Sequence, residues 1–470
     1  MKVTPTPEDS GDAATPIQSP PDSRITDRVA LPEELALRLV DRLHVQFLRR
    51  SPSTLWNRLL LGLTLIGPGI LVMLGDNDAG GVVTYMQTGA KYGIGLFLPL
   101  MIALGFVAYL VQEMTIRLGA VTRRGHAEMI WKRYGPFWGA FSLFDLVVAN
   151  ILTLMTEFIG IRIAGEVFGW PYGLTVPLAA LFVILCLVYL RYWTWERLSL
   201  LIAAFNLVFV PITLFSHPDW KAAAESFAGH GWLVAGGFLS APFLILLSAN
   251  IGTTIAPWQL FFQQSCVVDK GLVPKDIDAS RRDLMIGVGG MVLVAMALIL
   301  LSGQYIHGQP GASHFDIERM IAILQSRLGP WVSRLFALGL LEAGLIASIV
   351  ITASSSWAIG EAFDIPRSLN ARPKQAWGFY APGIVSVGLA SGIVLLPHLA
   401  LGFLNLTVQV VATIFMPAAL LFLLMLLNDR ELMGDAVNGM IRNVLSIGIM
   451  VLLIVCNTLY GIAALWPHTL

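Results

Sequence analysis

The sequence predicts an all-α polytopic membrane protein with two inverted five-helix repeats and an eleventh transmembrane helix. Three observations lead to this prediction. Of the 470 residues, 56% are apolar and only 13% are charged, roughly half the charged share of a soluble domain. Apolar stretches that could each span a bilayer, which takes about 20 residues, follow one another with little sequence between them. The first and sixth stretches contain Gly or Pro near the middle, as expected if each repeat begins with a broken helix.

Eleven candidate spans account for most of the chain. They lie near residues 59–88, 94–116, 140–164, 174–191, 198–216, 238–265, 284–304, 333–360, 378–397, 401–427 and 443–466. The domains that we expect are a disordered cytoplasmic tail (1–30), an amphipathic cytoplasmic segment (31–58), the first repeat (59–237), the second repeat (238–427), and a cytoplasmic loop with the last span (428–470).

The distribution of basic residues predicts the orientation. If the N-terminus is cytoplasmic, 24 of the 30 Lys and Arg residues lie in the tail and the cytoplasmic loops. The other side keeps Lys91, Arg162, Lys221, Arg319, Arg327 and Arg334. Because basic residues of short loops mark the cytoplasmic side, we expect the C-terminus outside. We expect the chain to act as a monomer in a bacterial inner membrane.

Composition also limits the partners and the chemistry. The 30 acidic residues balance the 30 basic ones, so no basic surface suggests nucleic-acid binding. Cys186, Cys266 and Cys456 fall in or beside apolar stretches and read as buried thiols rather than as a disulfide framework or a zinc site. The eight histidines fall in tails or at span ends, where we expect them on the surface.

The first span carries two carboxylates in the middle of an apolar stretch. A charge at the bilayer centre costs about 3 kcal/mol on insertion scales, and nothing cationic lies near Asp76 and Asp78 on this segment. We therefore expect them to face a wet cavity, a cation or a partner helix. Gly80 and Gly81 let the helix unwind, which frees backbone carbonyls, that of Gly75 among them, as oxygen ligands. A loop between two ordinary spans, with solvated acids, is the alternative.

The sixth span contains a proline near its middle. Pro257 has no N–H and pushes the preceding turn open, so the carbonyls near Thr253 and Thr254 would lack partners in lipid. An ion can satisfy them. The alternative is a proline kink without a ligand role.

These motifs resemble the NRAMP family of divalent-metal transporters, over nearly the whole chain after residue 58. The family's Gly-Pro-Gly lead and Asp-Pro-Gly-Asn motif correspond to Gly67-Pro68-Gly69 and Asp78-Ala79-Gly80-Gly81, and its Met-Pro-His-Asn motif to Ala256-Pro257-Trp258-Gln259. Weaker matches are Gln112, Arg117-Leu118-Gly119, Thr122, Thr156-Glu157-Phe158-Ile159-Gly160, Gly344-Leu345 and residues 428–434. The resemblance implies a leucine-transporter-like fold and alternating access.

The departures from the family motifs bear on the choice of metal. The resemblance implies that the metal ligands are the Asp and Asn of span 1, the Met of span 6 and neighbouring carbonyls. Asp78 corresponds to the family's Asp. Gly81 stands at the position of the family's Asn, and Ala256 at that of its Met. Losing the thioether removes a bias toward softer metals, and both changes should enlarge the site. Mg²⁺ prefers one or two carboxylates with retained water, and the pattern resembles the NRAMP-related magnesium transporters. We therefore expect import of Mg²⁺, with Mn²⁺ also carried.

Other ligands and the coupling follow from the same resemblance. The Gly75 and Thr253 carbonyls are candidate ligands, Gln409 matches a family Gln that reaches the occluded metal, and Asp76 ranks second. We expect no cofactor, because the metal is cargo.

Proton-coupled relatives use a His after the span 6 proline and an Asp in span 3, where this chain has Trp258 and Leu154. Of the family's acidic and basic residues in this region, only Glu157 is present here. We interpret it as a structural hydrogen-bonding acid. We predict uncoupled transport.

Other functions remain open at this stage. A proton-coupled Mn²⁺/Fe²⁺ carrier of the ordinary family type is the main alternative. A membrane-embedded aspartyl enzyme would need a second Asp beside Asp76, and Asp145 is the only obvious mate, so we expect no enzyme. A channel would need repeated filter segments. The role of Glu342 is undecided.

Overall fold

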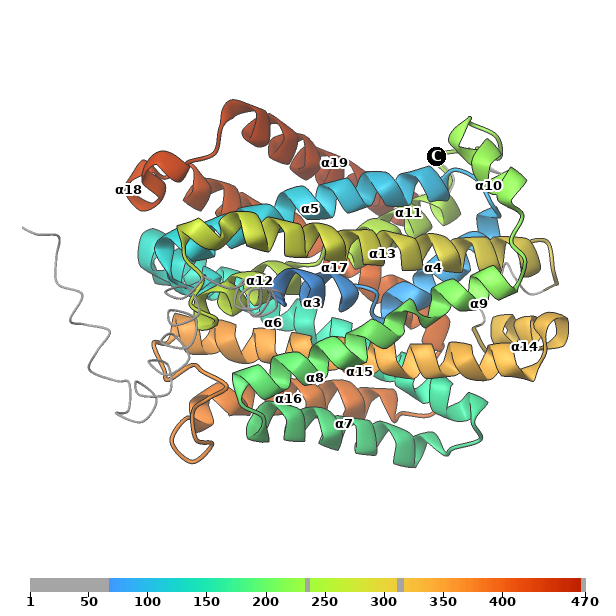
Figure 1. Cartoon of the computed structure of the whole chain (residues 1–470), viewed down its shortest axis with the longest axis horizontal. Coiled ribbons are helices and arrows are strands. Elements are labelled where there is room, and N and C mark those ends of the chain that lie inside the picture. Colours follow the sequence, from blue (N-terminus) through green and yellow to red (C-terminus); the bar gives the residue numbers. More distant parts are fainter. Residues whose placement is uncertain (1–66, 233–236, 311–316, 466–470) are drawn as a thin grey trace, which may run out of the picture.

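The described residues, 67–232, 237–310 and 317–465 of the computed structural model, form a helical bundle whose long helices run roughly side by side (Figure 1). In this part of the chain, ten helices are long and apolar enough to cross a membrane. They are α5 (Phe97–Thr122), α6 (His126–Val167), α7 (Tyr172–Tyr189), the run α8–η2–α9 (Tyr192–Phe205, Asn206–Val208, Phe209–Phe215), α11 with α12 (Ala241–Thr254, Pro257–Asp269), η3 with α13 (Pro274–Asp276, Ile277–Tyr305), α15 (Pro330–Ala362), α16 (Trp377–Val394), α17 (Leu401–Leu427) and α19 (Met440–Leu465).

The first predicted span forms an interrupted pair instead of one helix, namely α3 (Pro68–Leu74) and α4 (Ala79–Tyr92). Together with the ten long helices, this pair accounts for all eleven predicted spans, and the all-α polytopic prediction is confirmed. The predicted tail and amphipathic segment, residues 1–58, lie outside the described residues.

Both predicted helix breaks are present. Residues 75–78 separate α3 from α4, and two extended residues, Ile255 (ψ 95°) and Ala256 (ψ 150°), separate α11 from α12. Pro257 explains the second break, because it cannot donate a helical hydrogen bond. The eighth span, also longer than one span needs, is the continuous helix α15 of 33 residues.

The third span differs from its prediction at its N-terminal end. α6 begins at His126 and is kinked at Gly135, whose backbone is non-helical (φ 86°, ψ 174°). The His126 ring lies edge-on to Phe261, 4.6 Å between centroids, and its Nδ1 is 2.9 Å from Gln264 Oε1. His126 is fully buried, so the expectation of a surface histidine is wrong here. The sequence shows only that the residue ends a span, whereas the fold covers that end with α12.

Two short helices between spans were not predicted, α10 (Trp220–Phe227) and α14 (Ile317–Leu328). α14 buries four apolar residues at i, i+3, i+4 and i+7 spacing: Ile317, Met320, Ile321 and Leu324. A search for long apolar stretches overlooks such a short amphipathic helix. Figure 1 shows both helices at the end of the bundle opposite to α18 (Arg430–Met433).

Small residues bring the start of α4 close to α6, and α6 close to α15. Gly160 of α6 lies directly against Ala79, so a methyl group there would clash. A Cβ at Gly344 of α15 would lie 2.8 Å from the carbonyl oxygen of Glu157. The start of α4 therefore packs almost backbone to backbone with α6, and α6 with α15.

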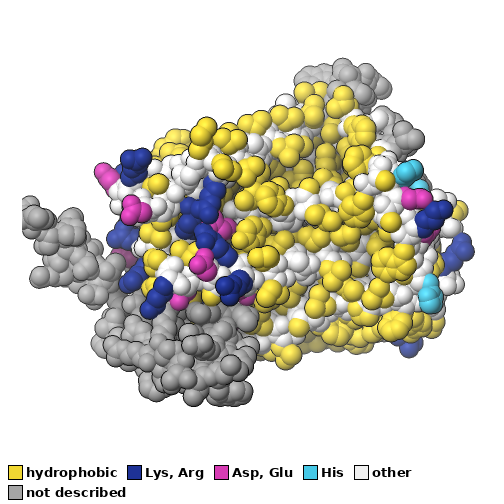
Figure 2. Space-filling model, turned by 45° about the horizontal axis from the view of Figure 1, so that its top comes forward, with side chains coloured by type: hydrophobic (Ala, Val, Ile, Leu, Met, Phe, Trp, Pro, Cys, Tyr) yellow, Lys and Arg dark blue, Asp and Glu magenta, His cyan; other side chains and the backbone are white. Residues whose placement is uncertain are grey.

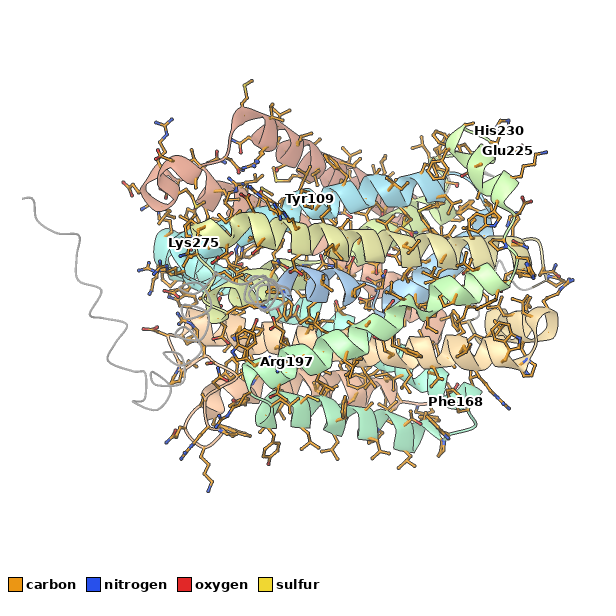
Figure 3. The ribbon with its side chains drawn as sticks, in the orientation of Figure 1. Tyr109, Phe168, Arg197, Glu225, His230 and Lys275 are labelled. Carbon is orange, nitrogen blue, oxygen red and sulfur yellow. The ribbon has the colours of Figure 1, made fainter. Side chains whose placement is uncertain are left out.

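The surface is that of an integral membrane protein. A broad apolar band covers the long helices, and charged side chains gather at the two ends (Figure 2). Lys275 lies at one end of the bundle, and Glu225 and His230 at the other (Figure 3). The three cysteines are buried and unpaired, as predicted: Cys186, Cys266 and Cys456.

Candidate functional site

Asp78 begins α4. Its backbone is extended (φ −65°, ψ 169°), and its carboxylate accepts a hydrogen bond from the Gly81 N–H. Aspartate is a favoured residue at a helix start, because it satisfies a free N–H and carries a charge that the helix dipole stabilises there. The side chain is buried, with 2% exposed. The first break thus holds a carboxylate inside the membrane-spanning bundle.

Thr253 links the second break to this carboxylate. Its hydroxyl donates to Asp78 Oδ1 at 3.5 Å, so the end of α11 lies against the start of α4. In a continuous helix the N–H of residue 257 would pair with the Thr253 carbonyl, and Pro257 lacks that N–H. Ala256, the residue before α12, has an extended backbone and contributes only a methyl group as its side chain.

Glu157 stabilises the first break from α6. Its Oε2 accepts a hydrogen bond from the Ala79 N–H at 2.9 Å, and its Oε1 accepts one from the Thr156 hydroxyl at 3.1 Å. In an uninterrupted helix the Ala79 N–H would donate to the Gly75 carbonyl. Glu157 therefore takes over the donor that this carbonyl would otherwise use. The geometry agrees with the interpretation of Glu157 as a structural hydrogen-bonding acid.

α17 approaches the same turn of α4. A Cβ on Gly80 would overlap the side-chain nitrogen of Gln409, and Asn405 Nδ2 donates to the Gly80 carbonyl at 3.1 Å. Gln409 Nε2 is buried and has no hydrogen-bond partner among the described residues. Gln409 thus lies beside the first break, while its role as a ligand stays a prediction.

Asp76 faces a different helix from Asp78. Gln259 of α12 donates to Asp76 Oδ1, and Gln112 of α5 donates to Gln259 Oε1 at 3.2 Å. The second oxygen, Asp76 Oδ2, is buried without a partner in the described part of the chain. Gln259 was not predicted as a site residue. The sequence feature that could have identified it is a glutamine inside an apolar span, two residues after the proline at the second break.

The backbone of the first break has a further contact, from a buried asparagine of another span. Asn206, at the start of η2, donates from Nδ2 to the Asn77 carbonyl at 2.8 Å. Asn77 Nδ2 in turn lies 3.4 Å from the carbonyl of Met291 on α13. The run α8–η2–α9 thus reaches the break between the two acids.

Trp258 and Leu154 occupy the predicted proton-relay positions and are both buried. The Trp258 carbonyl accepts a hydrogen bond from the Ser354 hydroxyl at 3.1 Å, and its ring packs edge-on against Phe262. Neither side chain can titrate at physiological pH, so these two positions contribute packing.

The expectation of an enlarged site stays a prediction, and at Gly81 the space is already filled in this conformation. A Cβ at Gly81 would lie 2.7 Å from Thr253 Oγ1 and 3.1 Å from Asp78 Oδ1. Without a side chain at position 81, α11 packs closely against α4 and takes up the space. Among the described residues, no three His, Cys, Asp or Glu side chains are grouped so that they could hold a metal. An ion bound here would need carbonyl, amide or hydroxyl oxygens as well as Asp78.

The contact between Asp76 and Gln259 yields a stability prediction. Gln259→Met keeps an unbranched side chain but leaves Asp76 and Gln112 buried without their partner. We expect a loss of about 1–3 kcal/mol, seen as a lower unfolding midpoint of the protein in detergent. In an Asp76→Leu background the same substitution should cost clearly less. An equal cost in both backgrounds would contradict the coupling.

Comparisons with known proteins show the family to which the chain is similar. The model of the family described as "Natural resistance-associated macrophage protein-like" matches residues 69–463. A protein of Pseudomonas aeruginosa named "Divalent metal cation transporter MntH 1" is 27% identical over 388 residues, which cover 79% of this chain and 85% of that protein. A "Divalent metal cation transporter MntH" of a Nostoc species is 23% identical over 432 residues, covering 88% and 94%.

Solved structures share the fold. A mutant of the Eremococcus coleocola manganese transporter superposes with a TM-score of 0.68 at 20% identity, covering 89% of this chain and 90% of that one. MhsT in complex with L-phenylalanine superposes with a TM-score of 0.53 at 13% identity, covering 84% and 98%. The predicted leucine-transporter-like fold is confirmed by these likenesses.

Proposed function

Because the chain belongs to the Nramp family, a family of transporters and not of enzymes, we propose that it carries divalent metal cations across the membrane by alternating access around the two helix breaks. The observation that carries this proposal is the buried carboxylate of Asp78 against Thr253. No lysine or arginine in the described ranges forms an ion pair with Asp78. A buried negative charge of this kind favours a cation as cargo.

The proposed ligands are the residues predicted from the sequence. Asp78 would supply charge, the carbonyls of Gly75 and Thr253 would supply oxygens, and Gln409 would complete the shell in the occluded state. The hydrogen bond from Ala79 to Glu157 supports the role of Gly75, because it removes that carbonyl's usual helical donor. Asp76, bound by Gln259, is the second-rank ligand.

Two ions are candidates for the cargo, Mn²⁺ and Mg²⁺, and the comparisons favour Mn²⁺. Relatives from several bacteria are named divalent metal cation transporters, and a manganese transporter shares the fold. The second candidate, Mg²⁺, is favoured by the side chains of this site. Ala256 offers no thioether, so the proposed donors are all oxygens, which suit a hard cation. We propose import of Mn²⁺-type divalent cations, with Mg²⁺ admitted by the oxygen-only site.

Uncoupled transport is supported by the chemistry of three positions. Trp258 and Leu154 cannot exchange protons, and Glu157 is engaged by Ala79 and Thr156. Proton coupling, as in the alternative Mn²⁺/Fe²⁺ carrier, would need a relay through other groups.

The predicted mate for an aspartyl enzyme lies far from the site. Asp145 and Glu157 are both on α6, and their separation of 12 residues corresponds to about 18 Å along the helix. Since Glu157 contacts the break through Ala79, an Asp76–Asp145 dyad has no support.

Asp78→Ala should abolish uptake of both Mn²⁺ and Mg²⁺ into proteoliposomes, because the only charged ligand proposed at first rank is lost. Glu225→Gln, at one end of the bundle (Figure 3), removes an acid outside the site and should leave uptake unchanged. Full activity of the Asp78 variant would contradict the site assignment.

A selectivity series of Mg²⁺, Mn²⁺, Ca²⁺ and Zn²⁺ in the same assay distinguishes the two cargo versions. We expect Mg²⁺ to be carried alongside Mn²⁺. Ala256→Met adds a thioether and should raise the preference for Mn²⁺ over Mg²⁺ about tenfold, equivalent to about 1.4 kcal/mol. A wild-type protein that carries Mn²⁺ and excludes Mg²⁺ would refute the magnesium version.

Metal uptake should also proceed without acidification of the liposome interior, measured with an enclosed pH dye. The reason is the absence of titratable side chains at positions 154 and 258. A metal-dependent proton signal that exceeds the leak of empty liposomes would show coupling and favour the alternative carrier.

A further inference from the structure

One carboxylate in the C-terminal half of α5 forms ion pairs with three guanidinium groups. Glu113 Oε1 lies 2.6 Å from Arg281 Nη2, 3.4 Å from Arg117 Nε and 3.7 Å from Arg442 Nη2. The arginines come from α13, α5 and α19 respectively. We refer to Arg117, Arg281 and Arg442 as the arginine cluster. Through Glu113 it links the eleventh predicted span, α19, to α5 and α13.

The arginine cluster carries more positive charge than its acids neutralise. Besides Glu113, the one acid among the described residues that pairs with the cluster is Asp278, which lies 2.9 Å from Arg281 and is 81% exposed. The Arg117 side chain is almost fully buried, whereas those of Arg281 and Arg442 are 29% and 42% exposed. The surplus charge is therefore presented at the surface by Arg281 and Arg442.

Exposed apolar side chains continue from the arginine cluster toward the middle of the bundle. Met285 follows Arg281 by one helical turn and is 58% exposed, and Leu445 follows Arg442 and is 39% exposed. Residues three or four apart share a helix face, so each of these faces begins with a cation and continues with hydrocarbon. In Figure 2 the basic side chains at this end of the molecule adjoin the apolar band.

We propose that the arginine cluster binds the phosphate of an anionic phospholipid, whose acyl chains lie along the exposed apolar faces of α13 and α19. Arginine pairs with phosphate through charge-assisted hydrogen bonds, and basic residues at a membrane surface attract anionic lipids. A free anion would use the cations but not the adjoining apolar faces. The bound lipid would bridge α13 and α19 and so hold α19 against the rest of the bundle.

Native mass spectrometry of the full chain in detergent, titrated with dioleoyl-phosphatidylglycerol, tests the proposal. We expect one lipid to bind and to raise the unfolding midpoint, and dioleoyl-phosphatidylcholine to do neither at the same concentration. Arg442→Gln should weaken the phosphatidylglycerol affinity about fivefold, the order expected for one arginine near a charged surface. Arg281→Gln combined with Arg442→Gln should weaken it further.

The control is Arg327→Gln, which removes an exposed arginine on α14, at the opposite end of the bundle (Figure 1). It should bind the lipid like the wild type. Arg442→Gln leaves the 2.6 Å pair of Arg281 with Glu113 in place, so it remains informative if the double variant fails to fold. Equal binding of both lipids, or unchanged affinity in Arg442→Gln, would overturn the proposal. An equal rise of the unfolding midpoint with inorganic phosphate would assign the cluster to a free anion instead.

Discussion

Every backbone polar group within a bilayer must find a partner inside the protein, and the two helix breaks are where this constraint acts. Residues 75–78 and 255–256 interrupt helices that would otherwise satisfy their own N–H and carbonyl groups. Side chains supply partners for the freed donors, since Asp78 accepts from Gly81 and Glu157 accepts from Ala79. The carbonyls of Gly75 and Thr253 lose their helical donors, and backbone oxygens of this kind suit a cation.

The distribution of charge agrees with this arrangement. Acids occur at the breaks, whereas the arginines that form ion pairs in the described segments cluster near the ends of helices, as around Glu113. The acids at the breaks are held by amides and hydroxyls, such as Gln259 and Thr253. These neutral donors stabilise a negative charge without cancelling it. A transported cation can therefore still be attracted to the site.

Local sequence features were sufficient to predict the spans and both breaks. Apolar length marks the spans, and glycine or proline in mid-span marks the interruptions, as at Pro257. Asp78 was recognisable because an acid in an apolar stretch needs a special environment. The contacts between Gln112 and Gln259, 147 residues apart, and between Asn206 and Asn77, 129 apart, could not be predicted. They depend on how each helix is rotated about its axis, which one sequence does not show. The same holds for the close approach of Thr253 to Gly81.

Locating the ion itself tests the central claim most directly. Crystals of the wild-type chain soaked with Mn²⁺ should give one anomalous peak within coordination distance of the Asp78 carboxylate, with backbone oxygens of both breaks in its shell. A peak elsewhere, for example beside Glu342, whose carboxylate oxygens are buried without a partner in the described residues, would contradict the account.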